Sequence, residues 1–192
     1  MNFLESLKSE EGFCIEHNME SVEIQKKSKM LCYKYNMCPP DDTQKKAEIL
    51  GELLGDYNEN VFIEPSFRCD YGFNIHFSGM AFINYNCVIL DTSPVHIGNE
   101  VFIGPGVCIA CAGHGMHPQQ RAVIETSKPI NIKDRVWIGA NSTVCSGVTI
   151  GEGSIIGAGS VVNKDIPAGV VAAGSPCRVI RKITDKDMVI LD

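Results

Sequence analysis

Residues 132–167 read IKDRVW IGANST VCSGVT IGEGSI IGAGSV VNKDIP when they are divided into consecutive groups of six. An aliphatic residue opens each group, and a small or slim residue follows four places later, from Val136 to Ile166. A helix would repeat every 3.6 residues and a half-buried strand every 2, so neither explains a strict period of six. Glycine directly after the aliphatic residue, at positions 139, 151 and 157, completes the pattern that is typical of a parallel β-helix. The stretch therefore predicts a triangular prism of short strands, with the aliphatic residue inside and the small residue at a corner.

A looser form of the same repeat extends towards the N-terminus. The spacing is six from Phe77 to Ile89, the phase slips by two residues at Val95, and the repeat resumes at Ile97. It then disappears over residues 111–129 and returns at Ile130. A break of this length must leave the coil as a protruding loop, and such loops are more often functional than decorative.

The first 57 residues have a helical pattern instead. One helix is expected from about Glu20 to Asn36, and another after a cap at Asp41 or Asp42, ending at Gly55. These helices are too polar to stand alone and should pack on the prism. We therefore expect a helical cap over residues 1–57, a β-helix catalytic domain over 58–183 with its loop at 111–129, and a tail over 184–192.

Composition narrows the function further. The chain has 192 residues, 44% of them hydrophobic, which suits one domain with an appendage. A net charge of −6 without a basic stripe argues against nucleic acid or an anionic membrane as the main partner. The odd number of cysteines, nine, indicates free thiols in a reducing compartment. The N-terminus lacks a signal pattern and no run is long enough to span a membrane, so we expect a cytoplasmic protein.

The outer faces of such a prism would carry Phe, Val and Cys side chains. Burial against identical copies removes such surface from water, and a threefold arrangement fits a triangular cross-section. We therefore expect a homotrimer.

In the order of its motifs, the chain resembles the maltose and galactoside O-acetyltransferases of the hexapeptide-repeat acyltransferase superfamily. The resemblance covers nearly the whole chain and is carried by residues 33–36 (YKYN), 63–65 (IEP), 67–72 (FRCDYG), 84–86 (NYN), 113–114 (GH), 136–139 (VWIG), 147–151 (GVTIG), 164–167 (KDIP) and 174–180 (GSPCRVI). It implies a left-handed coil, active sites at the subunit interfaces of a trimer, acetyl-coenzyme A as the donor and no metal.

His114, in the loop, aligns with the catalytic histidine of that family. Acetyl transfer to an alcohol needs a base, because a hydroxyl group is a poor nucleophile until its proton is being removed, and imidazole is suited to this task near neutral pH. His114 is therefore expected to activate a sugar hydroxyl for direct attack on the acetyl carbonyl, without an acyl-enzyme. A backbone N–H of the coil is the expected donor to the developing oxyanion.

The same alignment implies an acceptor pocket. Asn84 would hydrogen-bond a sugar hydroxyl, and Asp91 would do likewise or orient His114, since amide and carboxylate groups suit hydroxylated ligands. The remaining candidates for this pocket are Asp70, Tyr71, Glu16 and His117. Family members that acetylate sugars usually have an arginine where this chain has Gln25, which leaves the acceptor open.

Coenzyme A is expected to lie in a groove between coils, because its slender arm can bond to exposed backbone. The cofactor-binding candidates are Gly104, Trp137, Gly139, Ala140, Gly157 and Ala158 beside the pantetheine and acetyl group, and Asn163, Lys164, Arg178 and Arg181 near the phosphates.

Three other functions are weighed against sugar acetylation. The acceptor could be a different hydroxylated small molecule, such as an antibiotic. A zinc lyase of the carbonic anhydrase type is also built on this coil, but it needs three histidines, and the loop offers only His114 and His117. The third alternative is a trimeric scaffold without catalysis.

Overall fold

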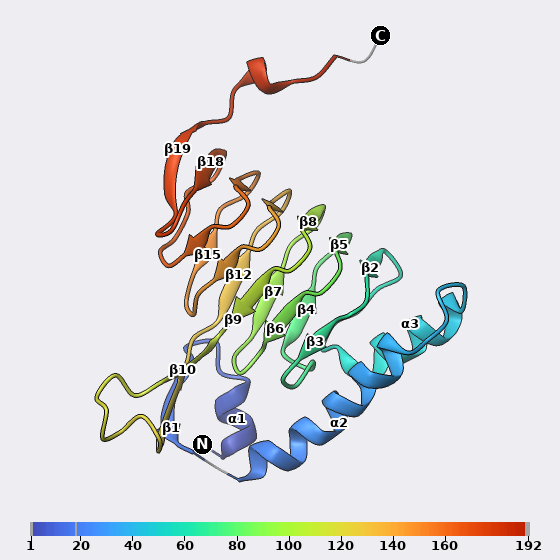
Figure 1. The fold of residues 1–192 in the computed structure, drawn as a ribbon, viewed down its shortest axis with the longest axis vertical. Helices are drawn as coiled ribbons and strands as arrows, with labels where there is room; N and C mark the ends of the chain where they lie inside the picture. The colour runs from blue at the N-terminus through green and yellow to red at the C-terminus, as the bar shows by residue number, and fades with distance from the viewer. Residues whose placement is uncertain (1, 18, 191–192) are drawn as a thin grey trace.

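The computed structural model describes residues 2–17 and 19–190 and shows a three-sided prism of stacked coils (Figure 1). The first face consists of β2 (Val61–Ile63), β5 (Ala81–Ile83), β8 (Val101–Ile103), β13 (Trp137–Ile138), β16 (Ile155–Ile156) and β18 (Val170–Ala173), with β19 (Arg178–Lys182) added antiparallel. The second face consists of β3 (Arg68–Cys69), β6 (Val88–Leu90), β9 (Cys108–Ala110), β14 (Thr143–Val144) and β17 (Val161–Val162). The third consists of β4 (Ile75–Phe77), β7 (Val95–Ile97), β12 (Ile130–Ile132) and β15 (Thr149–Ile150). All neighbours within the three coil faces are parallel, so the predicted parallel β-helix is confirmed.

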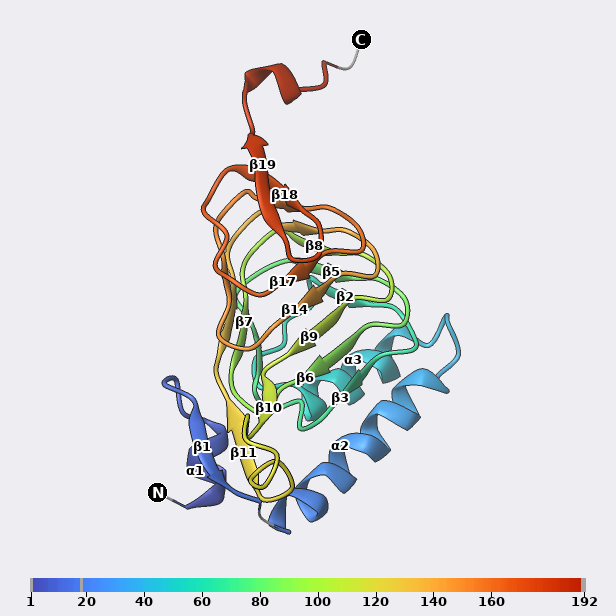
Figure 2. The ribbon, with the colours of Figure 1, turned by 60° about the vertical axis from the view of Figure 1, so that its left-hand side comes forward.

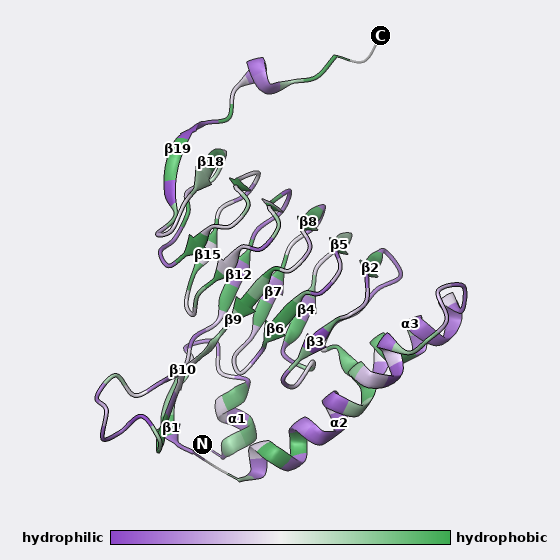
Figure 3. Cartoon of the chain, in the orientation of Figure 1, coloured by the Kyte–Doolittle hydropathy of each residue, from purple (hydrophilic) through white to green (hydrophobic). Residues whose placement is uncertain are grey.

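The aliphatic position of the repeat fills the core. In residues 132–167, the side chains at this position have no more than 1% exposure; they are Ile132, Ile138, Val144, Ile150, Ile156 and Val162. Ser142, Ser154 and Ser160, at the small position, are also buried. Figure 3 shows the strands in hydrophobic green while many of the bends are paler or purple. The roles predicted for the two repeat positions are confirmed.

The two-residue slip in the repeat is a feature of one prism edge. β2, β5 and β8 begin 20 residues apart, at positions 61, 81 and 101, whereas β13 and β16 begin 18 apart, at 137 and 155. The two extra residues fall between the second and third faces, where β6 is followed by β7. We call this the loop edge, because residues 111–129 leave the coil there, between β9 and β12. The opposite border of the second face, which contains Gly104, Gly139 and Gly157, is called the glycine edge.

Glycine follows the aliphatic residue because the next coil passes too close for a side chain. A Cβ at Gly139 would lie 2.6 Å from the backbone nitrogen of Ala158, which is shorter than van der Waals contact allows. Two residues later, Asn141 has a φ of 56°, in the left-handed region that asparagine tolerates. The corner sequences are therefore set by coil stacking.

The expected helices are present. They are α2 (Glu20–Asn36) and α3 (Thr43–Leu53), and the side chain of Asp42 caps α3 by accepting from the Lys45 N–H at 3.2 Å. The Asn36 side chain bonds to the backbone N–H and carbonyl of Phe67, both at 2.9 Å, and so ties the end of α2 to the prism. Figure 2 shows α2 passing the β3 end of the second face.

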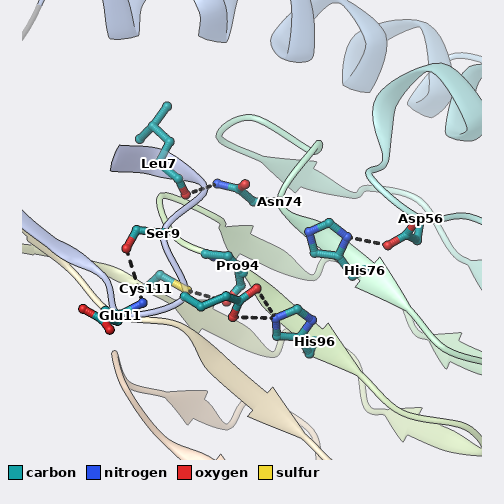
Figure 4. Close-up of polar contacts among 10 residues, drawn as sticks. Leu7, Ser9, Glu11, Asp56, Asn74, His76, Pro94, His96 and Cys111 are labelled. Carbon is teal, nitrogen blue, oxygen red and sulfur yellow. Dashed lines mark hydrogen bonds and ion pairs between the residues drawn. The ribbon is translucent and has the colours of Figure 1, made fainter. Parts of the chain in front are cut away.

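The N-terminal segment also contains structure that the helical pattern did not predict. α1 (Phe3–Leu7) is followed by β1 (Phe13–Glu16), which pairs antiparallel with β11 (Ile124–Ser127) of the loop. β10 (Ala112–His114) pairs with the other side of β11, so much of the expected structureless loop is a small sheet. Two contacts hold the N-terminal segment against the third face. The Asn74 side chain, just before β4, donates to the Leu7 carbonyl at 2.8 Å (Figure 4). Nε2 of His96, on β7, lies 3.0 Å from Oε1 of Glu10.

Of the tail, the structure describes residues 184–190, which include a short 3₁₀ helix, η1 (Asp185–Asp187). Among the described residues, no helix is both long and apolar enough to cross a membrane.

Candidate functional site

Four of the predicted site residues share the loop edge. Asp70 and Tyr71 follow β3, Asp91 follows β6, and His114 ends β10 in the segment that follows β9. Successive coils therefore bring these residues, which are far apart in sequence, to one side of the prism.

Asp91 lies beneath this surface and organises it. Its Oδ1 accepts from the backbone N–H groups of Asp70 (3.0 Å) and Tyr71 (2.9 Å), and its Oδ2 accepts weakly from Asn74 (3.4 Å). Burial raises the pKa of the Asp91 carboxyl to about 7, although the backbone bonds oppose this shift. Because Asp91 is 0% exposed, the expected direct contact with an acceptor is wrong for this structure. The residue positions Asp70 and Tyr71 instead.

His114 lies in the small sheet beside a carboxylate that the sequence analysis missed. It is directly opposite Glu125 in the β10–β11 ladder, and Glu125 is opposite Ile15 in the β1–β11 ladder. Directly opposite residues project from the same side of a sheet, with Cβ atoms about 5 Å apart. Ile15 packs in the apolar cluster that contains Tyr71, so this side of the sheet faces the loop edge. The exposed His114 side chain is thus placed on the same side as Glu125.

His17 is the second missed residue, and it binds Glu125. Its Nδ1 lies 2.5 Å from Oε1 of Glu125, and the His17 backbone N–H donates to the Val123 carbonyl at 2.7 Å. No local pattern could have found this pair, because the partners are 108 positions apart in the chain. Their contact depends on the pairing of β1 with β11.

Three other predicted acceptor residues are not brought together with His114 within one chain: Glu16, His117 and Asn84, the last of which follows β5 at the glycine edge, on the opposite border of the second face. Glu16 is opposite Ile124, one position from Ile15, and strand alternation directs it to the other side of the sheet. The prediction that Glu16 lines a pocket with His114 therefore finds no support within one chain. His117 is exposed, and its Nδ1 accepts only a long bond of 3.4 Å from the Gln119 N–H.

A cleft of about 650 Å³ lies next to Asp70, between α2 and the second face. Lys29 and Tyr33 line it from the helix, and Arg68, Asp70 and Leu90 line it from the prism. Burial raises the pKa of Asp70, Lys29 lowers it, and nearby Glu125 raises it further. The pKa of Asp70 thus responds to charges on both α2 and β11.

Gln25 stands at the position where the family resemblance implies an arginine, and its Oε1 accepts a hydrogen bond from Nζ of Lys29 at 3.0 Å. Its side chain also opposes the rise in the pKa of Tyr71 that burial causes. Ser28, one turn further along α2, donates to the Tyr71 carbonyl at 2.7 Å. The helix therefore holds the backbone of Tyr71.

The glycine edge gathers a second group of predicted residues. Its members are Asn84, Gly104, Gly139, Ala140, Gly157 and Ala158, all of which follow first-face strands. Trp137 is 53% exposed on the first face, immediately before this edge. Gly104, Ala140 and Ala158 are accessible on this edge, and none of them has a side chain larger than a methyl group. The backbone is therefore open, and the edge suits a slender ligand that hydrogen-bonds to it. These residues fit the pantetheine arm, although Gly104 and Gly139 are also required for coil stacking.

The candidates for phosphate binding are dispersed. Asn163 and Lys164 are exposed on the loop edge after β17, and Arg178 begins β19. The guanidinium group of Arg181 already binds Asp187 through two bonds of 2.7 and 2.8 Å, so this structure does not leave it free for a phosphate.

The second face therefore separates the two groups of site residues within one chain. The imidazole of His114 belongs to the loop edge, and the backbone groove beside Trp137 belongs to the glycine edge. An imidazole beside a carboxylate can move a proton, and an open backbone groove can hold an extended ligand. The two functions lie on different borders of the same face.

Two family models match this chain. One, described as a bacterial transferase hexapeptide with six repeats, matches residues 129–164, and the other, a maltose acetyltransferase hexapeptide capping motif, matches residues 16–58. The chain is 43% identical over 162 residues to the galactoside O-acetyltransferase of Escherichia coli K12, which covers 84% of this chain and 80% of that protein.

Solved structures agree with these matches. A maltose O-acetyltransferase from Clostridium difficile 630 superimposes with a TM-score of 0.87 at 38% identity, covering 96% of this chain and 99% of that one. A hexapeptide-repeat acetyltransferase from Vibrio cholerae, in complex with acetyl-coenzyme A, superimposes with a TM-score of 0.86 at 34% identity, covering 96% of this chain and 100% of the other.

Proposed function

Because this chain belongs to the acetyltransferases of the galactoside and maltose O-acetyltransferase type, we propose that it acetylates a sugar hydroxyl with His114 as the general base. Acetyl-coenzyme A is the co-substrate of this family. The observation that carries the proposal is the position of His114, which lies at the loop edge and is opposite the carboxylate residue Glu125 in the small sheet.

The reaction needs one proton transfer and no covalent enzyme intermediate. The acceptor hydroxyl oxygen attacks the acetyl carbonyl carbon while the imidazole of His114 removes the hydroxyl proton. The carbon–sulfur bond then breaks, and the same proton can pass to the departing thiolate of coenzyme A. Glu125 lies where a negative charge favours the imidazolium ion that forms in this step.

The acceptor would bind between α2 and the second face. Asp70, Arg68 and Lys29 offer both hydrogen-bond donors and acceptors to a polyhydroxylated ligand in this cleft. Asp91 supports the acceptor site by fixing the backbone of Asp70 and Tyr71.

The separation of the two edges supports a homotrimer. The glycine edge of one copy, placed against the loop edge of the next, would bring the donor groove to His114. The first face supplies apolar surface for such contacts, since Phe62, Phe82, Phe102 and Trp137 are aligned in register along its outside. Three of these four side chains are 47 to 56% exposed in the single chain.

Acceptor-dependent release of the coenzyme A thiol tests the proposal. With a panel of mono- and disaccharides, His114→Ala should lower the rate by roughly a hundredfold or more, the usual contribution of a general base. His96→Asn is the matched control, because His96 binds Glu10 on the third face, away from the loop edge, and its variant should retain activity. An unchanged rate in His114→Ala would contradict the assignment of the base.

The second candidate function is acetylation of a non-sugar acceptor, and the observation that favours it is Gln25. The neutral side chain of Gln25 supplies no positive charge to the proposed acceptor site, where the arginine of related sugar acetyltransferases would supply one. Hydroxylated antibiotics in the same assay distinguish the two: turnover of an antibiotic but of no sugar would replace the sugar proposal and leave the acetyl transfer itself intact.

A further inference from the structure

Two cysteines meet at the wall of the cleft. The Sγ atom of Cys32, on α2, lies 3.6 Å from the Sγ atom of Cys69, on β3, although the residues are 37 positions apart. Both side chains are buried within the chain, with 5% and 7% exposure, yet both contribute to the lining of the 650 Å³ cleft. A small molecule that enters the cleft can therefore reach this pair.

The two thiols are electronically unequal. Their mutual hydrogen bond lowers the pKa of Cys32, whereas the same bond and burial raise the pKa of Cys69. The thiolate is the form of cysteine that reacts with oxidants. Because the sulfur atoms lie 3.6 Å apart, either can attack the other once it is oxidised, and we assign the first oxidation to Cys32, whose thiolate the shared hydrogen bond favours.

We propose that Cys32 and Cys69 form an oxidisable dithiol that hydrogen peroxide converts to a disulfide, which cross-links α2 to β3 at the cleft wall. Among the described residues, no other contact between a helix and the prism joins two thiols. All nine cysteines are free thiols in this structure, so both members of the pair are available for oxidation. The proposal does not depend on the identity of the acceptor.

The oxidation balances in two steps. The Cys32 thiolate attacks one peroxide oxygen and becomes a sulfenic acid, and the released hydroxide takes up a proton to form water. The Cys69 sulfur then attacks the Cys32 sulfur, and the departing hydroxide leaves as water with the Cys69 proton. The dithiol loses two electrons, which reduce the peroxide oxygen–oxygen bond.

The disulfide would alter the cleft directly. The sulfur atoms must approach from 3.6 Å to about 2.05 Å, which draws α2 towards β3. Asp70 directly follows Cys69, and Tyr33 directly follows Cys32, so a residue on each wall is bonded to the cross-linked pair. Oxidation therefore fixes the spacing between the two walls.

Peptide mapping of the folded, full-length chain tests the proposal. After brief treatment with a few equivalents of hydrogen peroxide and alkylation of free thiols, trypsin and chymotrypsin should release residues 30–33 joined to residues 69–71. Dithiothreitol should separate the two peptides. The cross-link should also raise the thermal unfolding midpoint by about 5 °C, because it closes a long loop of the unfolded chain.

Three variants sharpen the result. Cys32→Ser and Cys69→Ser should each lose the linked peptide and the peroxide-dependent rise in the unfolding midpoint. The double variant Cys108→Ser/Cys145→Ser removes two half-buried neighbouring thiols from the second face and should keep both. The proposal is overturned if peroxide leaves Cys32 and Cys69 alkylatable in the wild-type chain, or if either one is found joined to a different cysteine. The wild-type map decides this even if a serine variant folds poorly.

Discussion

Glu125 interacts with residues on both sides of the proposed active site. It lies opposite His114 in the sheet, binds His17 through Oε1, and influences Asp70 electrostatically. A carboxylate that faces a developing imidazolium near a protein surface contributes on the order of 1 kcal/mol. Glu125→Gln should therefore lower kcat roughly fivefold and leave the KM for acetyl-coenzyme A unchanged, as measured by thiol release.

Glu10→Gln is the matched control for that variant. Glu10 also pairs with a histidine, but it does so with His96 on the third face. If Glu10→Gln lowered kcat as much as Glu125→Gln, the loss would reflect general weakening of the N-terminal segment and not the charge beside His114.

Asp91 gives a pH-dependent prediction. Burial raises its pKa from 3.8 to about 7, so the folded chain holds a proton between these values that the unfolded chain has released. The free energy of unfolding should therefore fall as the pH rises from about 4 to about 7. Asp91→Asn removes this titration and should flatten the dependence, which urea unfolding at fixed chain concentration can measure. Equal slopes in the two proteins would contradict the shift.

The sequence allowed some of these residues to be predicted and concealed others. His114 was recognisable because it interrupts a strict repeat between two glycines. Glu125 and His17 carry no such local sign, because their importance arises from the pairing of β1 with β11. Asp91 was recognisable as a candidate, but its burial depends on how the first and second coils stack, which spacing alone does not reveal.

At the level of elements, the period of six predicted the coil and the helical pattern predicted α2 and α3. The small sheet of β1, β10 and β11 was not predicted, since β1 is a four-residue strand in a segment dominated by helices, and its partner lies in an insertion. Strand pairing across such a distance is decided by tertiary contacts and not by local propensity. The winding hand came from the family resemblance, because general crossover rules favour the opposite one.

The corners of the coil allow two glycines to be distinguished experimentally. A Cβ at Gly151 would lie 2.4 Å from the Ala168 backbone nitrogen, whereas a Cβ at Gly153 would meet nothing within 4 Å. Gly153 has a φ of 66°, close to the 57° of Arg135 at the same prism edge and the 56° of Asn141 at another edge. Gly151→Ala should therefore destabilise the chain by roughly 2 kcal/mol, and Gly153→Asn by less than about 1 kcal/mol, in urea unfolding. Similar losses for both would show that coil stacking is not what requires Gly151.

At the scale of the whole molecule, the proposed homotrimer predicts that catalysis depends on neighbouring copies. His114 is on the loop edge and Asn84 on the glycine edge, with the second face between them. Trimers of His114→Ala alone or Asn84→Ala alone should therefore be nearly inactive, because each site contains one defective edge. When the two variants are refolded together, a site with two intact edges forms wherever the loop edge of an Asn84→Ala chain meets the glycine edge of a His114→Ala chain.

Random mixing in equal amounts should create such sites at roughly a quarter of the interfaces and restore about a quarter of the wild-type rate. Mixing the folded variants without unfolding is the control, because stable trimers should not exchange chains. Light scattering should give three times the 21.0 kDa chain mass for every sample. Full activity in a monomer, or no recovery in mixed trimers of that mass, would contradict a site shared between copies. Either result would mean that both edges of a single chain serve the same reaction, so that His114 and the donor groove would have to meet within one copy.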